Sequence, residues 1–436
     1  MKKSVSALSL LMALCLSACT VFPVPQKNSQ PESSVEPSET VVSTPSTAEP
    51  SKELSSEPSQ EPSKEPSKEP SREPSKQQSK EPSHEYGDTF PESWHDNGIF
   101  SAYYQKAYDK MRKMSLDEKI GQMLYSRCPQ YDAVRFAQKY HLGGYVLFGV
   151  DFADKSKEEV KSNIYSYINS QDIPMTIAVD EEGGTVVRIS SKSALYDSEF
   201  QSPRDIYNWG GMDAVKENAL AMAEMLNDFG IDVNFAPVCD ISLDENDFMY
   251  YRSIGHDTET VCEFVSEFTK IAQENGVSAT LKHFPGYGNN ADTHTGIAID
   301  NRPYEKFVNE DFKPFEAGIE QNAHLVMVSH NIVNCMDSTK PASLSKNVHD
   351  ILRNELGFTG IAVTDDLEMN AITDYTNGTS PAVAAILAGN DMLTIGDTMI
   401  EDAVNSIKSA LSDGTLDIEL IDHSVTRILA WKYYRQ

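Results

Sequence analysis

The 436-residue chain has few cysteines, and none of them form a closely spaced pair. The six stand at positions 15, 19, 128, 239, 262 and 335, without any Cys-x-x-Cys motif. A disulfide-stapled small domain or a zinc knuckle is recognised by such spacing, so the sequence indicates neither. We expect the last four cysteines to be thiols in a folded core.

Basic residues are also scarce. The chain has 37 Lys and Arg against 66 Asp and Glu, which gives a net charge of −29. Most of this negative charge lies after residue 86. A strongly acidic domain repels polyanions and anionic lipid surfaces, so we expect no nucleic-acid partner.

The N-terminus lacks an apolar run long enough to span a bilayer comfortably, although residues 5–16 are largely apolar. Lys2 and Lys3 precede this run, as in a secretory signal peptide. The following Leu-Ser-Ala-Cys, ending at Cys19, resembles the lipobox of bacterial lipoproteins. That resemblance implies cleavage after residue 18 and a lipid on Cys19, holding the protein at the outer face of the cell membrane. The alternative is an ordinary signal peptide that contains a cysteine.

Residues 19–86 have almost no aromatic side chains, only Phe22 and Tyr86. Variants of Glu-Pro-Ser-Lys recur from Glu57 to His84. Such a segment cannot bury enough apolar surface to offset the entropy lost on ordering. We expect a disordered spacer that holds the next domain away from the membrane, within or at the cell wall. A ligand-binding repeat is the alternative.

The region 87–436 contains the apolar runs that the linker lacks. Eight short runs are found at 122–125, 144–148, 175–179, 233–238, 278–281, 325–328, 360–363 and 392–395. Helical patterns lie between them at 213–230, 259–276, 306–323, 348–357, 380–389 and 400–412. Alternating strands and helices predict a parallel α/β sheet, and eight units favour a single (β/α)8 barrel of the TIM type. An open doubly wound sheet is the alternative.

Polar residues follow five of these runs directly. They are residues 180–184, Asp240, Lys282 with His283, Ser329 with His330, and Asp365 with Asp366. The carboxyl ends of barrel strands form one rim, where active sites lie, so this pattern indicates an enzyme. Helix capping explains an isolated Asp or Ser, but it does not explain the Lys-His and Asp-Asp pairs.

Three stretches carry a combination of motifs: 178–188, 282–286 with 292–294, and 363–369. Supporting matches lie at 118–123, 142–148, 234–238, 252–253 and 388–392. Together they resemble glycoside hydrolase family 3 from about residue 114 onwards. The Asp-x-His element is similar to that of β-N-acetylglucosaminidases of the peptidoglycan-recycling type. Family β-glucosidases usually take their acid/base Glu from a second domain, for which we expect no room here.

The resemblance implies catalytic roles for three residues. Asp365 matches the family nucleophile, and a retaining glycosidase needs such a carboxylate together with a proton-transfer group. His294 takes the second role, because histidine gives and takes protons near neutral pH. Asp292 lies on the same face of an extended loop and can orient the His294 ring. We favour Asp365 over its neighbour Asp366 as the nucleophile, and expect Asp366 to cap or hydrogen-bond locally. The alternative for the other two residues is an Asx turn at Asp292 with a solvated His294.

The same resemblance implies that Asp180, Arg252, Lys282 and His283 hold the hydroxyls of the non-reducing sugar. Glu182 and His330 are weaker candidates. A zinc site from His283, Asp292 and His294 is the rival interpretation, but the neighbouring Lys282 disfavours a cation there. We therefore expect no metal and no cofactor.

The leading hypothesis is a lipid-anchored, retaining exo-β-N-acetylglucosaminidase acting on N-acetylglucosamine-containing saccharides or muropeptides, as a monomer. The alternatives are a β-glucosidase or β-xylosidase of the same family, and a lipoprotein that binds muropeptides without cleaving them. The sequence departs from many relatives at Tyr287, where they have His, and its loop from 288 to 292 is one residue shorter.

Overall fold

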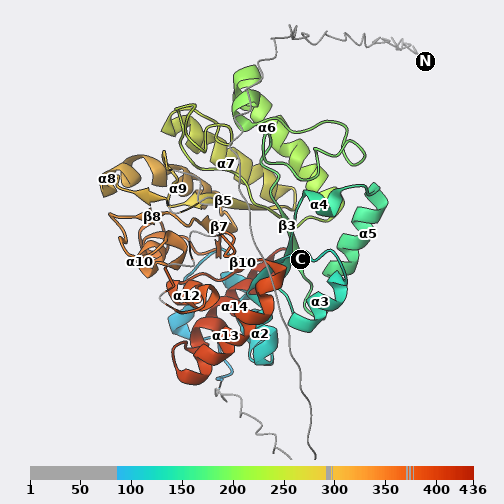
Figure 1. Ribbon diagram of the computed structural model, residues 1–436, viewed down its shortest axis with the longest axis vertical. Helices are drawn as coiled ribbons and strands as arrows, with labels where there is room; N and C mark the ends of the chain where they lie inside the picture. The colour runs from blue at the N-terminus through green and yellow to red at the C-terminus, as the bar shows by residue number, and fades with distance from the viewer. Residues whose placement is uncertain (1–85, 291–295, 297, 370–371, 373–374, 377) are drawn as a thin grey trace, which may run out of the picture. The chain divides into compact units, whose positions relative to one another are not determined.

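The computed structural model describes residues 86–290, 296, 298–369, 372, 375–376 and 378–436, and its centre is a barrel of eight parallel strands (Figure 1). The strands pair in the order β10-β1-β2-β3-β4-β5-β7-β9, and a parallel bridge between Val363 and Met392 nearly closes the ring. They are β1 (Leu124–Arg127), β2 (Gly144–Leu147), β3 (Thr176–Val179), β4 (Val233–Asn234), β5 (Ser278–Phe284), β7 (Leu325–Val328), β9 (Ile361–Thr364) and β10 (Leu393–Ile395). The predicted (β/α)8 barrel is confirmed, and the open-sheet alternative is wrong.

Helices lie outside the ring of strands (Figure 1). They are α1 (Tyr104–Met111), α2 (Leu116–Gln122), α3 (Ala133–Tyr140), α4 (Gly149–Phe152), α5 (Lys157–Ile168), α6 (Pro203–Phe229), α7 (Thr258–Glu274), α8 (Tyr304–Lys306), α9 (Phe312–Glu320), α10 (Lys346–Asp350), α12 (Pro381–Ala388), α13 (Ile400–Asp413) and α14 (Ile418–Tyr434). The π-helical segments η3 (Phe307–Asp311) and η5 (Ile351–Glu355) follow α8 and α10. All six predicted helices are therefore present, but two of them are not α-helical throughout: η3 interrupts the one predicted at 306–323, and η5 replaces the second half of the one predicted at 348–357.

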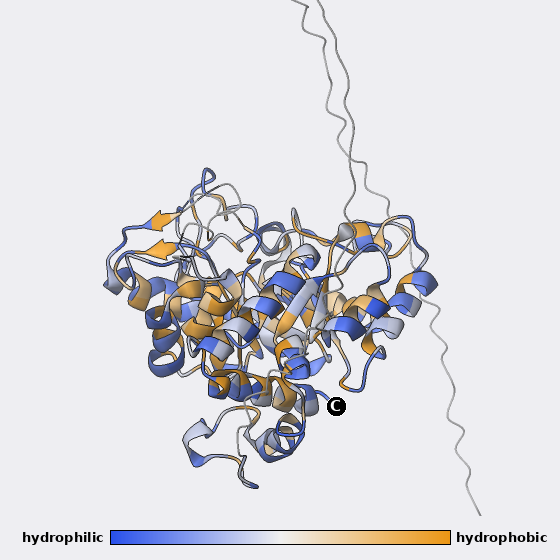
Figure 2. Cartoon of the chain, turned by 60° about the horizontal axis from the view of Figure 1, so that its bottom comes forward, coloured by the Kyte–Doolittle hydropathy of each residue, from blue (hydrophilic) through white to orange (hydrophobic). Residues whose placement is uncertain are grey.

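The strands are apolar because both of their faces are covered. Every residue of β2, β3, β7 and β9 is buried. In a parallel sheet with helices outside and packed side chains inside, a strand meets no water. Figure 2 shows hydrophobic residues gathered in the interior and hydrophilic residues on the outer faces of the helices.

Local signals set the ends of α6. The side chain of Ser202 accepts a hydrogen bond from the Asp205 N–H, and Pro203 occupies the first turn. Gly230 ends the helix with a φ of 80°, a conformation that favours glycine. These signals place the loop between β3 and α6 at the carboxyl rim of the barrel, where residues 180–188 belong to the site.

A second sheet of two short parallel strands was not predicted. It pairs β6 (Ile299–Asp300) with β8 (Ile332–Val333), which belong to the segments that follow β5 and β7. Asp300 accepts hydrogen bonds from Arg302 and from the Asn290 side chain. The small sheet thus supports the turn that leaves β5.

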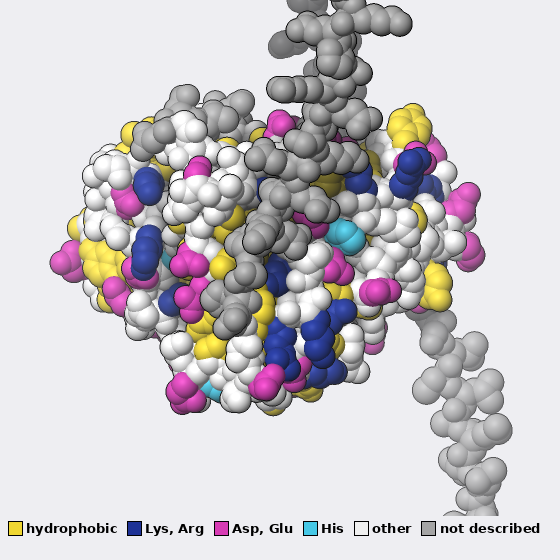
Figure 3. Space-filling model, turned by 90° about the horizontal axis from the view of Figure 1, so that it is seen from below, with side chains coloured by type: hydrophobic (Ala, Val, Ile, Leu, Met, Phe, Trp, Pro, Cys, Tyr) yellow, Lys and Arg dark blue, Asp and Glu magenta, His cyan; other side chains and the backbone are white. Residues whose placement is uncertain are grey.

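Acidic side chains are spread around the edge of the face seen in Figure 3, in keeping with the negative charge of the chain. Tyr86 and Lys119 both bind the buried carboxylate of Asp422 in α14, at 2.8 and 2.7 Å.

Within the part of the chain that the structure describes, no helix has the length and apolarity of a membrane span.

Candidate active site

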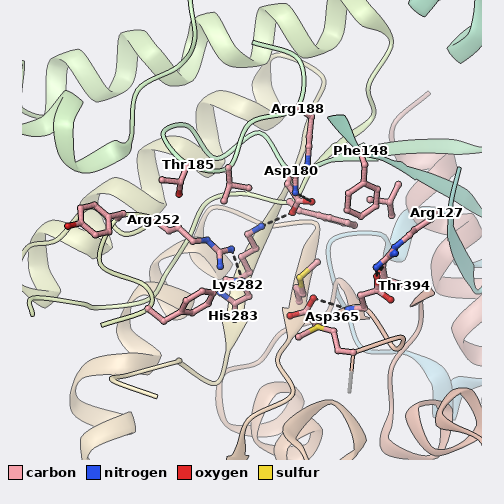
Figure 4. Close-up of a pocket in the computed structure, with 18 residues that line it drawn as sticks. Arg127, Phe148, Asp180, Thr185, Arg188, Arg252, Lys282, His283, Asp365 and Thr394 are labelled. Carbon is pink, nitrogen blue, oxygen red and sulfur yellow. Dashed lines mark hydrogen bonds and ion pairs between the residues drawn. The ribbon is translucent and has the colours of Figure 1, made fainter. Parts of the chain in front are cut away.

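A cavity of about 510 Å³ opens at the carboxyl ends of the barrel strands (Figure 4). Its volume lies in the range of small-molecule sites. Five of the seven predicted site residues line it: Asp180, Arg252, Lys282, His283 and Asp365. The other two, Asp292 and His294, lie outside the described residues. The fold therefore brings together residues that are up to 185 positions apart, because they lie at or after the carboxyl ends of four strands, β3, β4, β5 and β9.

Lys282 and Arg252 both form ion pairs with Glu182, which is almost fully buried. The Arg252 guanidinium donates two hydrogen bonds to the Glu182 carboxylate, at 2.6 and 2.9 Å. The Lys282 ammonium lies 2.5 Å from the same carboxylate. Burial disfavours the ionised form of Glu182, but Arg252 and Lys282 outweigh this effect and hold its pKa well below the usual range. Glu182 is thus a structural carboxylate that fixes two cations at the cavity wall.

Asp180 joins the same network from the end of β3. Its Oδ1 accepts a hydrogen bond from Lys282 Nζ at 2.9 Å, and its Oδ2 accepts one from Arg188 Nη2 at 3.2 Å. Among the described residues, the buried Nε of Arg188 has no partner. The wall around Asp180 therefore offers carboxylate acceptors and guanidinium donors together, which suits a polyhydroxylated ligand.

His283 is held through both of its ring nitrogens. Nδ1 lies 2.8 Å from Asp240 Oδ2, and Nε2 lies 3.2 Å from Arg252 Nη2. A carboxylate can only accept and a guanidinium can only donate, so a neutral ring with its hydrogen on Nδ1 satisfies both. A metal ion on His283 would have to displace one of these partners. The zinc alternative otherwise depends on Asp292 and His294, outside the described residues.

Asp365 and Asp366 occupy different environments at the end of β9. The Asp365 N–H donates to the Val328 carbonyl at 3.0 Å, and its Oδ1 accepts from the Asp366 N–H at 2.8 Å. Asp366 instead forms an ion pair with Arg127 at 2.5 Å and caps the Glu368 N–H at 3.0 Å. The carboxylate of Asp366 is therefore engaged in the local structure, as expected for that residue.

His330 lies behind the cavity rather than in its lining. Its ring is fully buried, with Nδ1 2.7 Å from the Ser343 hydroxyl and Nε2 3.0 Å from the Asp366 carbonyl. These contacts fix the chain around Asp366. Both weaker candidates, His330 and Glu182, therefore make contacts that stabilise the wall around the cavity.

The turn after β5 is fixed on three sides. The Asn290 side chain donates to the Tyr287 carbonyl at 2.8 Å and to Asp300 at 2.9 Å. Arg302 donates to the Gly286 carbonyl at 3.2 Å and binds Asp311. Burial raises the pKa of Asp311 to about 6, although Arg302 opposes the rise. The loop that carries residues 292 and 294 thus starts from a well-supported turn.

Several cavity residues were not predicted as site residues, chiefly Arg127, Phe148 and Arg188. Asp240, which lies beside the cavity and binds His283, was not predicted as one either. The guanidinium carbons of Arg127 and Arg188 lie 5.2 and 5.4 Å from the centre of the Phe148 ring. The sequence did contain a signal for Arg127 and Phe148. Arg127 follows the first apolar run, and Phe148 ends the second. The same strand-end rule that singled out Lys282 would have found them.

The chain is similar to known proteins over most of its folded region. The family model described as glycosyl hydrolase family 3 N terminal domain matches residues 115–431. Among curated proteins, the chain is similar to beta-hexosaminidase LpqI of Mycobacterium tuberculosis (strain ATCC 25618 / H37Rv). The two are 30% identical over 310 residues, which cover 69% of this chain and 78% of that protein.

Solved structures agree with the sequence comparison. A glycoside hydrolase family 3 beta-N-acetylglucosaminidase from Paenibacillus sp. str. FPU-7 superposes with a TM-score of 0.68 and 29% identity. The match covers 74% of this chain but 63% of that one, so the Paenibacillus chain contains a substantial part without a counterpart here. M tuberculosis LpqI superposes with a TM-score of 0.67 and 27% identity, covering 75% of this chain and 96% of that one.

Proposed function

Because the chain belongs to glycoside hydrolase family 3 and is therefore a glycoside hydrolase, we propose that it is a retaining exo-β-N-acetylglucosaminidase. It releases terminal N-acetylglucosamine from peptidoglycan-derived fragments. One observation carries this proposal: Asp365 shares a cavity with Asp180, Arg252, Lys282 and His283. The names of the relatives, beta-hexosaminidase and beta-N-acetylglucosaminidase, support the choice of sugar.

In the proposed first step, Asp365 attacks the anomeric carbon of the terminal sugar. The bond from that carbon to the leaving oxygen breaks, and His294 donates a proton to this oxygen. An ester then joins Asp365 to the sugar. In the second step His294 removes a proton from water, which attacks the same carbon and restores the Asp365 carboxylate. Two inversions leave the sugar with its original β configuration.

The two proton transfers require a group that changes charge near neutral pH, which histidine does. We assign Asp292 to orient the His294 ring, as a carboxylate orients the histidine of other hydrolases. The fixed turn at Gly286–Asn290 supports this assignment, because it gives the loop a defined starting point beside His283.

The remaining residues hold the sugar in the proposed complex. Asp180 offers acceptors to hydroxyls, while Arg252 and Lys282 offer charged donors. Such hydrogen bonds are stronger than neutral ones and orient a polyol whose hydroxyls differ only in direction.

We further propose that the enzyme acts outside the cell, anchored through a lipid on Cys19 and extended by the spacer 19–86. A relative named as an uncharacterized secreted glycosyl hydrolase supports an extracellular site. The spacer suggests a substrate in the cell wall, which is why peptidoglycan fragments are favoured over other glucosaminides. The protein needs no metal in this scheme.

Hydrolysis of p-nitrophenyl N-acetyl-β-glucosaminide tests the proposal. The wild-type protein should release p-nitrophenol, and Asp365→Asn should be slower by at least about 10³-fold, as for the loss of other covalent nucleophiles. Asp413→Asn, an exposed carboxylate, serves as control. An inactive wild type, or an Asp365→Asn variant as active as the wild type, would contradict the proposal.

The sugar specificity has its own test within the same assay. Aryl β-glucoside and β-xyloside should be much poorer substrates than the N-acetylglucosaminide. Faster hydrolysis of either would assign the protein to the β-glucosidase or β-xylosidase alternative. Binding of muropeptides without any product would favour the non-catalytic alternative.

A further inference from the structure

Asp240 is a buried carboxylate beside the cavity that the proposed mechanism does not use. It follows β4, and only 1% of its surface is exposed. Both of its oxygens accept hydrogen bonds. Oδ2 accepts from His283 Nδ1 at 2.8 Å and from the His283 N–H at 3.2 Å, while Oδ1 accepts from the Tyr287 N–H at 2.7 Å. One side chain therefore binds two parts of the segment that leaves β5.

The bond to His283 determines which ring nitrogen carries the hydrogen. Because the Asp240 carboxylate only accepts, the hydrogen lies on Nδ1 and the neutral ring keeps a lone pair on Nε2. That lone pair faces Arg252 Nη2 at 3.2 Å, and Arg252 is fixed in turn by Glu182. Asp240 thus sets the hydrogen-bonding character of His283 and, through it, the position of Arg252.

The bond to Tyr287 fixes the turn. Tyr287 is 2% exposed and packs with Val238 and Met249, its ring lying 5.6 Å from that of His283. At Gly286, φ is 119°, and an added Cβ would lie 2.5 Å from Asp311. The turn therefore favours glycine at position 286, and Asp240 holds the first N–H beyond it.

We infer that Asp240 is a positioning residue that couples the two halves of the active site. Through His283 it sets the sugar-binding half, and through Tyr287 it sets the start of the loop that leads to the proton-transfer residue His294. The inference rests on the proposed function, because it takes His283 and His294 in the roles assigned there. No direct contact between Asp240 and the substrate is implied.

An Asn at position 240 cannot satisfy both bonds. Its single oxygen can face Tyr287, which leaves an amide N–H against His283 Nδ1. The ring must then carry its hydrogen on Nε2 and point it at the Arg252 guanidinium, a donor facing a donor. If the oxygen faces His283 instead, the amide N–H opposes the Tyr287 N–H. Asp240→Asn therefore disturbs one half of the site in either orientation.

The first measurement is made on the wild-type protein. Long-range ¹H–¹⁵N NMR of histidine-labelled enzyme distinguishes Nδ1–H from Nε2–H rings, and a His283→Gln variant identifies the His283 signals. The expected form is Nδ1–H. A neutral Nε2–H ring in the wild type would overturn the inference, whatever happens to the variants.

The second measurement compares Asp240→Asn with wild type on two β-N-acetylglucosaminides, one with a p-nitrophenyl and one with an alkyl leaving group. Loss of buried charged hydrogen bonds should raise KM for both roughly 10- to 100-fold. The alkyl substrate depends on protonation of its leaving oxygen, so its kcat should fall several-fold further. Values within twofold of wild type, or equal losses of kcat on both substrates, would overturn the coupling.

Asp422→Asn is the matched control, since Asp422 is equally buried and also binds two partners, but outside the cavity. It should lower thermal stability without changing the ratio of activities on the two substrates. A shift of that ratio in the control as large as in Asp240→Asn would overturn a specific role for Asp240. If the wild type cleaves neither substrate, the proposed function is contradicted. The NMR measurement still tests the bond from His283 to Asp240, because it does not depend on activity.

Discussion

Glu182 illustrates how a residue without direct contact to a substrate can decide whether a site exists. It is the shared counter-ion of Arg252 and Lys282, two cations that are buried or nearly so. Without the Glu182 carboxylate, the positive charges of Arg252 and Lys282 would repel each other more strongly. The sequence marks Glu182 as one of several acidic residues after β3, but its partners come from segments 70 and 100 positions away.

Glu182→Gln should therefore weaken both binding and folding. We expect a rise in KM and a loss of about 3 kcal/mol in the free energy of unfolding, because the buried Arg252 loses its carboxylate partner while Lys282 keeps only Asp180. Since the pKa of Glu182 is lower in the folded state, its contribution is complete above the unfolded pKa of about 4.3 and is lost as pH falls below it. Urea unfolding at pH 7 and at pH 4 measures this difference. Glu401→Gln, at an exposed site, should show no such loss, and an unchanged KM in Glu182→Gln would contradict the account.

Most proposed site residues could be predicted from the sequence because each directly follows an apolar run. Asp180, Lys282, His283 and Asp365 all satisfy this rule. Their pairing could not be predicted, since it depends on which strands are neighbours and on side-chain direction. Asp240 satisfied the rule as well, but nothing in the sequence distinguishes an acid that holds His283 from one that caps a helix.

At the scale of elements, the turn after β5 links the fold to the proposed chemistry. Gly286 has a φ of 119° and no room for a Cβ beside Asp311. Gly286→Ala should shift the turn, lower kcat/KM and destabilise the protein by about 2 kcal/mol. Gly357→Ala is the control, because its φ is 69° but nothing lies within 4 Å of the added carbon. Equal kcat/KM for the two variants would contradict a role of the turn in catalysis.

The residue directly before β7 is a histidine whose buried position disfavours its protonated form. His324 is buried against Phe100 and Tyr434, and its Nδ1 lies 2.8 Å from the Ser278 hydroxyl. Burial, with help from the positive charge of Arg435, lowers its pKa to about 3. Between pH 3 and 6.5 the unfolded chain binds a proton at this site that the folded chain does not, so His324 makes stability rise with pH in that window.

His324→Asn should flatten this dependence by as much as about 1.4 kcal/mol per pH unit in the middle of the window. Urea unfolding of both proteins at several values between pH 3.5 and 7 measures the slope. The exposed His95 provides the control variant, His95→Asn. Identical slopes for His324→Asn and wild type would show that His324 is protonated in the folded state.

The eight strands and six of the helices could be predicted because their patterns are long and repeated. Strands covered on both faces must be apolar, which leaves a signal of several residues. The β6–β8 sheet left none, since each of its strands has two residues and Ile299 is exposed. The π-helical segments η3 and η5, within the helices predicted at 306–323 and 348–357, likewise left no signal in the pattern.

At the scale of the whole molecule, the proposal places an acidic barrel outside the cell on a lipid and a spacer. Cys19→Ala should move the protein from the membrane fraction into the medium when it is expressed in a bacterium that lipidates its exports. Cys15→Ala should stay with the membrane, because that residue would be removed with the signal peptide. Immunoblots of the membrane fraction and of the medium show where each variant is found. Membrane retention of Cys19→Ala would contradict the lipid anchor.

The central claim is double displacement at a terminal β-linked N-acetylglucosamine through Asp365. The most direct test is ¹H NMR of the products in the first minutes of hydrolysis, before the released sugar mutarotates. The account predicts that the β-anomer of N-acetylglucosamine appears first and that Asp365→Asn gives none. Initial release of the α-anomer, or release of the β-anomer by Asp365→Asn at the wild-type rate, would contradict it.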